Sequence, residues 1–317
     1  MPMPVIVIVG PTAVGKSGFA LSVAEMLDTE IISADSMQIY RGMSIGVAAP
    51  SPDDLKRVRH HFVGAIEPGQ TFSAADFARS ALGIVDELNA RKRVPLVVGG
   101  SGLYVRALVD GLFPGPPADK RLRQRLKEVA ADKGQRYLHE RLRTVDPSSA
   151  AKIHPHDLRR VVRALEVFEL TGVPISELQQ MYQDAKPDLD VTFVGLDRRR
   201  QDLYRRIDER VERMFERGLV AEVADLLERG YGTEIDRIRP LGYPEARAYL
   251  LGEIDIDRAK YLIRRNSRRY AKRQLTWFRA DPRIRWFLFS ADEEAADYAV
   301  QVCRAVRIIQ VRSATSR

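Results

Sequence analysis

The stretch that decides the fold runs from Val5 to Ser17 and reads VIVIV-GPTAVGKS. Its first five residues form an apolar run that predicts a buried β-strand. The next eight match the pattern G-x-x-x-x-G-K-[ST] without a gap: Gly10, Pro11, Thr12, Ala13, Val14, Gly15, Lys16 and Ser17. A strand followed by this pattern and then a helix is the context in which the pattern forms a phosphate-binding loop.

Each part of this loop has a physical purpose. Glycines let the backbone wrap closely around an anion, while the loop N–H groups and the helix N-terminus point at it. Lys16 adds a positive charge, and Ser17 offers a hydroxyl to Mg²⁺. We therefore expect an enzyme that binds the phosphates of a small-molecule substrate on residues 10–17, with Mg²⁺ as its cofactor.

Strands and helices alternate outward from this loop. We expect a helix from Lys16 to about Asp28, further strands at 30–34, 94–98 and 191–196, and a helix near 103–109. Such alternation is typical of a doubly wound parallel sheet. The predicted fold class is therefore α/β, with a P-loop NTPase-like parallel sheet.

A helical domain is expected as an insertion into this sheet. The run Phe113-Pro114-Gly115-Pro116-Pro117 interrupts regular structure, and the amphipathic stretches near 120–143 and 157–171 predict helices after it. We assign residues 118–190 to the insertion and residues 1–117 and 191–317 to the core domain. Within the latter, helices are expected at about 200–217, 219–229, 243–251 and 255–279.

Composition narrows the setting. Of the 317 residues 45% are hydrophobic, enough for a core, yet no apolar run reaches the roughly 18 residues of a membrane span. The apolar start lacks a basic segment before it, so we interpret it as a strand and not as a signal peptide. A single cysteine, Cys303, excludes an internal disulfide and a cysteine-built zinc site. We expect a cytoplasmic protein that has no membrane partner and acts as a monomer.

Positive charge is concentrated near the end of the chain. From Arg258 to Arg285 there are eleven Lys or Arg and one acid, a net charge of +10, so with +8 for the whole chain the remainder sums to −2. Two rows recur at i+4 and predict one broad cationic helix face, with aromatic residues nearby: Arg264, Arg268 and Lys272; Arg265, Arg269 and Arg273; and Tyr270, Trp277 and Phe278. This favours a polyanionic partner such as RNA over a merely solvated face, which would normally mix both signs.

The chemistry carried out at the loop is less constrained. The strand at 94–98 ends in Gly99-Gly100, without the aspartate that usually helps to hold Mg²⁺ in an NTPase. Asp35 lies just past another strand, at the edge where doubly wound sheets bind ligands. It is either a proton acceptor or the cap of a turn with Ser36. The five histidines form no metal-binding pattern.

Taken together, the segments resemble the tRNA dimethylallyltransferase family, which prenylates an adenosine beside the tRNA anticodon. The resemblance covers about residues 5–285. It rests on eight ordered segments: residues 10–17, 33–43, 72–77, 98–104, 153–155, 163–167, 241–243 and 271–279. Two departures stand out: Ser101 stands where threonine is common, which keeps the hydroxyl, and Pro240 and Pro244 flank the segment 241–243.

The resemblance implies roles for individual residues. The substrates would be tRNA and dimethylallyl diphosphate. Asp35 would be the general base that faces the adenosine N6, and Lys16 and Arg210 would be catalytic cations at the diphosphate. Positions that match tRNA contacts are Asp35, Ser36, Met37, Gln38, Ser101, Arg123, Arg159, Arg160, Val161, Val162, Arg163, Leu241, Gly242, Tyr243, Lys272, Arg273, Gln274, Trp277 and Arg279. Two other functions fit the loop itself: an ATP-dependent small-molecule kinase, and a nucleotide-gated RNA-binding module without catalysis.

Overall fold

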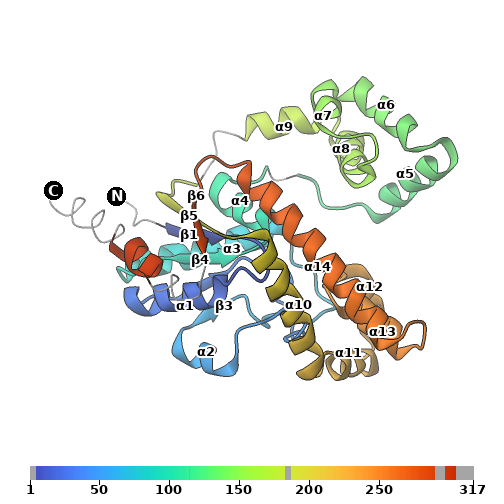
Figure 1. Ribbon diagram of the computed structural model, residues 1–317. Coiled ribbons are helices and arrows are strands. Elements are labelled where there is room, and N and C mark those ends of the chain that lie inside the picture. The colour runs from blue at the N-terminus through green and yellow to red at the C-terminus, as the bar shows by residue number, and fades with distance from the viewer. Residues whose placement is uncertain (1–4, 114, 183–186, 290–296, 305–317) are drawn as a thin grey trace, which may run out of the picture. The chain divides into compact units, whose positions relative to one another are not determined.

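A computed structural model describes residues 5–113, 115–182, 187–289 and 297–304. The chain divides into two compact units (Figure 1). The core unit spans Met1–Val109 and Asp188–Arg317, and the helical unit spans Asp110–Pro187. The helical unit therefore interrupts the core unit in the sequence. Among the described residues, no helix combines the length and the apolar character needed to cross a bilayer.

A six-stranded parallel sheet forms the centre of the core unit. Its strands are β1 (Val5–Val9), β2 (Ile31–Ser33), β3 (His60–His61), β4 (Leu96–Gly99), β5 (Val191–Arg198) and β6 (Arg285–Phe289). They lie in the order β3-β2-β4-β1-β5-β6, and every pairing is parallel. Strands β2, β3 and β4 lie on one side of β1, and β5 and β6 lie on the other side. The carboxyl end of β1, where residues 10–17 begin, is thus the switch point at which such sheets bind ligands.

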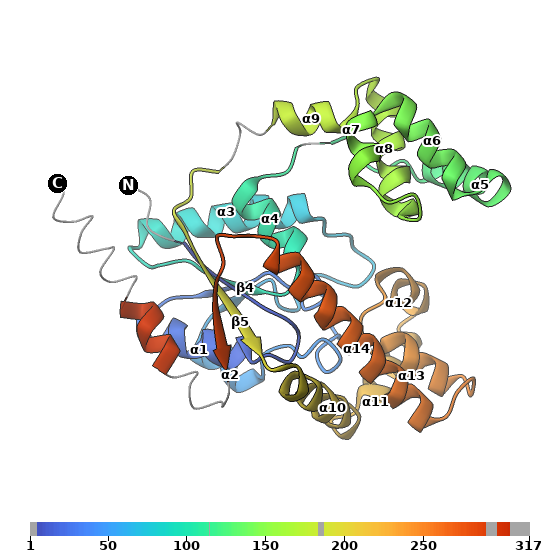
Figure 2. The same cartoon turned by 45° about the horizontal axis from the view of Figure 1, so that its top comes forward.

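Alternate residues of β1 explain why both faces of the sheet are covered. Ile6 and Ile8 join a core with α1 (Lys16–Leu27) and the start of α10 (Arg200–Glu216). Val5, Val7 and Val9 join a second core with α3 (Ala74–Ala90) and α4 (Gly102–Asp110). Figure 2 shows α1 and α3 on opposite sides of the strands. A strand buried on both faces needs the continuous apolar sequence that β1 has.

A group of helices packs together with α10: α11 (Leu219–Glu228), α12 (Gly232–Ile238), α13 (Tyr243–Leu250) and α14 (Ile256–Arg279). Helix α2 (Pro52–Arg57) lies near α1 instead, where its Arg57 pairs with Glu25. A third core of buried side chains joins α10, α11, α13 and α14 to residues 39–47. Helix α14 runs beside α10 in both views (Figures 1 and 2) and sends Ala271 and Phe278 into the two cores of the sheet.

The helical unit has a core of its own. It consists of α5 (Lys120–Lys133), α6 (Gln135–Val145), α7 (Pro147–Lys152), α8 (Leu158–Thr171) and α9 (Ile175–Met181). Apolar residues of α5, α6 and α8 pack together in its interior. The carboxylate of Glu166 lies fully buried there, and it accepts hydrogen bonds from Arg123 (2.7 Å), Arg163 (2.6 Å) and the Asp119 N–H (2.8 Å). Burial alone would raise the pKa of Glu166, but these hydrogen bonds outweigh it and lower the pKa.

The parallel α/β sheet predicted from the sequence is confirmed, and the four predicted strands are present within a residue or two. The sequence analysis missed β3, which has only two residues, and β6, which lies at the edge beside β5. The single amphipathic stretch near 120–143 is in fact two helices. Gly134, with φ 85°, separates α5 from α6.

The ends of β2 and β4 approach each other closely at Gly99. A Cβ atom at this position would lie 2.0 Å from the Ala34 carbonyl oxygen and 2.8 Å from the Ala34 Cα, so backbone would have to move. Residue 99 therefore has to be glycine for Asp35 and Ser101, which follow these two strands, to lie side by side.

We predict that Gly99→Ala lowers the free energy of unfolding by about 1–3 kcal/mol, the usual cost of overpacking a tight interior. Gly83→Ala is the matched control, because Gly83 lies exposed in α3 with no atom within 4 Å of the added methyl. It should be neutral or stabilising by up to about 1 kcal/mol, since alanine is the better helix former. Urea unfolding of both variants measures the difference. Equal stabilities would contradict the close approach.

Candidate active site

The loop at residues 10–17 has the backbone conformation of an anion-binding site. Gly10 and Gly15 have φ values of 150° and 107°, in the region that favours glycine. A Cβ atom at Gly10 would lie 2.5 Å from the Leu196 carbonyl oxygen, so only glycine fits beside β5. Helix α1 begins directly after the loop at Lys16, so its N-terminal N–H groups face whatever the loop encloses.

Lys16 bends back over this loop. Its Nζ donates hydrogen bonds to the carbonyl oxygens of Gly10 (3.0 Å) and Pro11 (2.8 Å). Burial lowers the pKa of Lys16 to about 8, while the nearby charge of Asp35 raises it and that of Arg210 lowers it further. A group with this pKa can lose its proton near neutral pH unless a negatively charged ligand stabilises the ammonium form.

Three arginines surround the same loop. Arg210 donates to the Thr12 hydroxyl (2.6 Å) and to the Gly46 carbonyl (3.3 Å). Arg206, one turn earlier on α10, donates to the Ala13 carbonyl (3.0 Å), and Arg198, at the end of β5, donates to the Val14 carbonyl (2.9 Å). Burial lowers the pKa of Arg210, but a guanidinium keeps its proton in proteins. Four cationic side chains therefore lie around one short loop.

The sequence analysis had assigned only Arg210 among these arginines. The i, i+4 spacing of Arg206 and Arg210 on one predicted helix was a usable signal, because it puts both side chains on one face. Arg198 was recognisable only as the last residue of a strand beside β1. Arg198 and Arg206 donate to loop carbonyls, so these two side chains help to hold the loop in place.

Asp35 lies at the neighbouring strand end. Its Oδ1 accepts a hydrogen bond from the Met37 N–H (2.9 Å), so it does cap a turn, as one of the two hypotheses proposed. Among the described residues, Oδ2 has no hydrogen-bond donor. Asp35 is also close enough to Lys16 and Arg210 for its charge to raise the pKa of both. Capping and proton acceptance are thus compatible, one on each oxygen.

Ser101 and Tyr270 complete the surroundings of Asp35. The Ser101 hydroxyl accepts from the Ser36 N–H (2.9 Å), and the Ser101 N–H donates to the Ala34 carbonyl (3.2 Å). Burial and the charge of Asp35 raise the pKa of Tyr270 to about 12, while the nearby Ser101 side chain acts to lower it. Gln38, also an expected contact, bridges from Ser33 to the Ala48 carbonyl. These polar side chains come from three segments distant in sequence.

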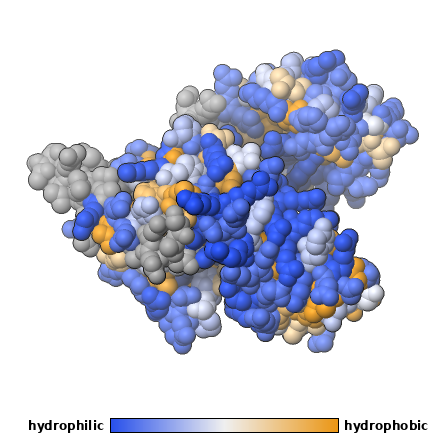
Figure 3. Space-filling view, in the orientation of Figure 1, coloured by the Kyte–Doolittle hydropathy of each residue, from blue (hydrophilic) through white to orange (hydrophobic). Residues whose placement is uncertain are grey.

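The cationic face of α14 is narrower than predicted, because two of the three residues in one row are paired. Arg264 forms an ion pair with Glu212, and Arg268 with Asp208, both on α10, so these charges are offset between the two helices. Arg269, Lys272 and Arg273 are exposed. Figure 3 shows the hydrophilic surface that covers α10 and α14. The cationic surface consists of this exposed subset.

Several expected tRNA contacts of the core unit are buried. Gln274 is 6% exposed, and Gly242 and Tyr243 are also inside. The Tyr243 hydroxyl donates to Glu222 (2.6 Å), whose carboxylate also accepts the N–H groups of residues 44–46. These three residues shape the site from within and offer no surface to a tRNA.

The other expected contacts of this region lie at the surface. Leu241 lines a hollow of about 250 Å³ with Arg239, Arg269 and Arg273. Trp277 and Arg279 are exposed, and Arg279 is paired with Asp197.

In the helical unit, too, some of the residues expected to contact tRNA are buried and others are exposed. Val161 and Val162 belong to its apolar core, so they support α8 and cannot contact tRNA in this conformation. Arg159 and Arg160 are exposed on the same helix. Arg123 and Arg163 are partly exposed and bind Glu166, as described above.

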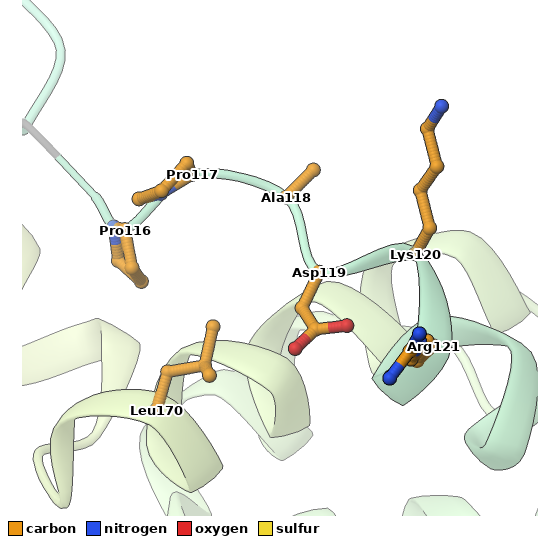
Figure 4. A pocket seen from close by; sticks show the side chains of 7 residues that line it. All are labelled: Pro116, Pro117, Ala118, Asp119, Lys120, Arg121 and Leu170. Atoms are coloured by element: carbon orange, nitrogen blue, oxygen red, sulfur yellow. The ribbon is translucent and has the colours of Figure 1, made fainter.

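A hollow of about 570 Å³ in the helical unit is a weaker candidate site (Figure 4). Pro116, Pro117, Ala118 and Leu170 supply much of its lining, and Lys120 points away from the helix that carries Leu170. Its one carboxylate, Asp119, already caps α5 by accepting from the Leu122 N–H (2.9 Å). The convergence of cations and an acid at the sheet edge is the better site.

A metal at this site would depend on its ligand for most of its coordination. Within the described ranges there is no group of three or more His, Cys, Asp or Glu that could hold a metal ion. The exposed Ser17 hydroxyl at the start of α1 is the donor that the loop provides. Mg²⁺ usually keeps several waters and binds substrate phosphates with few protein ligands, so a single hydroxyl is compatible with it.

Comparisons with known proteins identify the family. The sequence model of the IPP transferase family matches residues 38–281. The chain is 48% identical to a tRNA dimethylallyltransferase of Geobacter sulfurreducens over 90% of this chain and 92% of the relative, and 48% identical to one of Carboxydothermus hydrogenoformans over 89% and 91%.

Solved structures extend the similarity to the whole fold. A full-length tRNA isopentenylpyrophosphate transferase from Bacillus halodurans has a TM-score of 0.70 at 36% identity, covering 98% of this chain and 99% of its own. A eukaryotic dimethylallyltransferase acting on tRNA has a TM-score of 0.78 at 25% identity, over 99% and 80%. With the family model matching most of its length, this chain belongs to the IPP transferase family.

Proposed function

We propose that this protein is a tRNA dimethylallyltransferase. It transfers the dimethylallyl group of dimethylallyl diphosphate to N6 of the adenosine on the 3′ side of the tRNA anticodon, giving N6-isopentenyladenosine and diphosphate. The observation that carries the proposal is the meeting of a four-cation phosphate loop with the carboxylate of Asp35 at one sheet edge. Relatives named for this reaction, similar over nine-tenths of the chain, support it.

The loop would stabilise the leaving group. When the bond between C1 and the diphosphate oxygen breaks, negative charge develops on the diphosphate. Lys16, Arg210, the Thr12 hydroxyl and the loop N–H groups would stabilise that charge where water is excluded. Mg²⁺, held by the Ser17 hydroxyl and by diphosphate oxygens, would supply additional charge neutralisation.

Asp35 would act on the acceptor. The lone pair of an adenine N6 is delocalised into the ring, so this amine is a weak nucleophile. As the N6–C1 bond forms, Asp35 Oδ2 would take the proton that the amine loses, while Oδ1 keeps its bond to Met37. Neither ATP hydrolysis nor phosphoryl transfer is needed, which fits the absence of a carboxylate after β4.

The acceptor base must leave its stack to react. An adenosine stacked in an anticodon loop cannot reach a carboxylate at a sheet edge, and turning it out costs a few kcal/mol. Gln38 and Ser101, which lie at the sheet edge with Asp35, are our candidates for holding the base. Water must be excluded there, because an allylic cation-like centre would be hydrolysed.

We propose that the protein acts as a monomer in the cytoplasm. The test of function is incubation of the protein with unmodified tRNA and labelled dimethylallyl diphosphate, with a parallel reaction containing labelled ATP. We expect label in tRNA from the first and none from the second. Phosphate transfer from ATP to a small molecule, with unlabelled tRNA, would establish the kinase alternative. Nucleotide binding with no covalent change in RNA would establish the RNA-binding module.

Asp35→Asn separates the two roles of this side chain. The amide oxygen still accepts from the Met37 N–H, so the turn and tRNA binding should persist, with the Kd for tRNA changed less than about twofold. Turnover should fall by about 10²–10⁴-fold, the usual contribution of a general base. Steady-state kinetics and filter binding measure the two quantities. Turnover within about threefold of wild type would show that Asp35 is not the base.

The pKa of Lys16 predicts a pH dependence. The ammonium form binds the diphosphate, so kcat/KM for dimethylallyl diphosphate should fall as pH rises through about 8, approaching tenfold per unit. Lys16→Arg keeps its charge at these pH values, so whatever activity it retains should lack the decline. A profile of both enzymes from about pH 7 to about pH 10 makes the test. Persistence of the decline in Lys16→Arg would assign it to another group.

The exposed row of α14 predicts a salt dependence. Replacing Arg269 and Arg273 by Gln should weaken tRNA binding and reduce the slope of log K against log salt by about 0.7–0.9 per lost phosphate contact. The control is Lys56→Gln with Arg79→Gln, which removes the same charge from exposed positions on α2 and α3. An equal change of slope in both double variants would mean that only net charge matters.

A further inference from the structure

Gln274 is a buried amide on the cationic helix α14. Only 6% of it is exposed, although its helix neighbours Lys272 and Arg273 face the solvent. Its Oε1 accepts a hydrogen bond from the Thr12 N–H at 2.8 Å, and its Nε2 donates to the Gly100 carbonyl at 2.9 Å. The oxygen and the nitrogen of the amide therefore both have a hydrogen-bond partner, as buried polar side chains usually do.

The two partners of Gln274 belong to the two halves of the site. Thr12 lies in the phosphate loop, and its hydroxyl is held by Arg210. Gly100 precedes Ser101, whose hydroxyl receives the N–H of Ser36 next to Asp35. The side chain thus joins the segment that would hold the diphosphate to the segment that would hold the acceptor base.

The approach of Gln274 to Gly100 is specific. A Cβ atom at residue 100 would lie 2.1 Å from Nε2, so glycine makes room for this contact. The partners are one backbone N–H and one backbone carbonyl, so the side chain between them must both accept and donate. An uncharged amide can do both, whereas a carboxylate only accepts and a thioether offers no N–H or O–H donor.

We propose that Gln274 is a positioning residue for prenyl transfer: it fixes the diphosphate loop relative to the end of β4, where Ser101 holds the turn that carries Asp35, and so aligns C1 of the donor with N6 of the acceptor. The proposal rests on the function proposed above. Misplacement of reacting atoms by about 1 Å can cost about 10²-fold in rate. Among the described residues, Lys16 and Arg210 have no hydrogen bond to Gln274, so we expect affinity for the diphosphate to be retained when the bridge is lost.

Gln274→Met tests the bridge with a side chain of similar length and no hydrogen-bond donor. Single-turnover kinetics should show the rate constant for transfer reduced by at least about tenfold, with the Kd for dimethylallyl diphosphate changed less than about threefold. Thr276→Val, at an exposed position of the same helix, is the control and should match wild type in both. A wild-type rate in Gln274→Met, or loss of rate and affinity in equal measure, would overturn the proposal.

Gln274→Glu supplies a readout that a purely packing role would not give. A buried carboxyl has a raised pKa, and its protonated form restores both bonds, with O–H donating to Gly100 and the second oxygen accepting from Thr12. The transfer rate of this variant relative to wild type should therefore rise as pH falls from about 8 to about 5.5. If the ratio of the two transfer rates did not depend on pH, the bridge would be contradicted. This test does not require Gln274→Met to fold.

Hydrogen exchange distinguishes failure of this proposal from failure of the proposed function. The Thr12 amide should be protected in wild type and exchange at least about tenfold faster in Gln274→Met, whatever reaction the enzyme catalyses. Unchanged exchange with an active wild-type enzyme would refute the bridge alone. A wild-type enzyme that leaves tRNA unmodified would refute the proposed function, and with it the positioning role.

Discussion

The desolvation of cations around residues 10–17 is the constraint on which the chemistry of this site depends. Burial is the largest effect on Lys16 and on Arg210, and it lowers the pKa of both. Asp35 is the acid whose charge opposes this effect in both cases. In the free protein Asp35 therefore offsets part of the positive charge, and a bound diphosphate would take over that role. The same carboxylate is then available to accept a proton.

Helix α14 explains how one element serves both substrates. Its inner side pairs Arg264 and Arg268 with α10, the helix that sends Arg206 and Arg210 to the phosphate loop. Its sheet-facing side places Tyr270 and Gln274 beside Ser101 and Gly100. Its outer side carries the exposed cations. Because a helix turns a new face every residue, a sequence that is basic nearly throughout can still supply three different surfaces.

The sequence was sufficient for the parts that follow from local rules. The phosphate loop, the buried strands and the helices that follow three of them, at 16–28, 103–109 and 200–217, depend on residues close together in the chain, and the structure confirms them. The ordered motifs identified the family, which the comparisons confirm. The edge strand β6 was missed because it forms by pairing with β5, which is distant in sequence.

Burial was the information that motifs could not provide. A match between segments assigns a role to every position in the segment, whether the side chain is exposed or buried. Four residues assigned to tRNA contact in this way are buried: Val161, Val162, Tyr243 and Gln274. For Arg264 and Arg268 the missing information was the acid on the neighbouring helix. A helical wheel drawn on α14 alone cannot show that Glu212 and Asp208 offset two of the three charges in one of its rows.

The central claim is that the loop binds a diphosphate through Lys16. Titration calorimetry of the wild-type protein and Lys16→Ala with inorganic diphosphate and Mg²⁺ tests it directly. The account predicts binding by the wild-type protein that dimethylallyl diphosphate competes away, and an affinity at least about 10²-fold weaker in Lys16→Ala, as expected when a charge-stabilising group is removed. Equal affinities in the two proteins, or no binding of diphosphate by the wild-type protein, would contradict it.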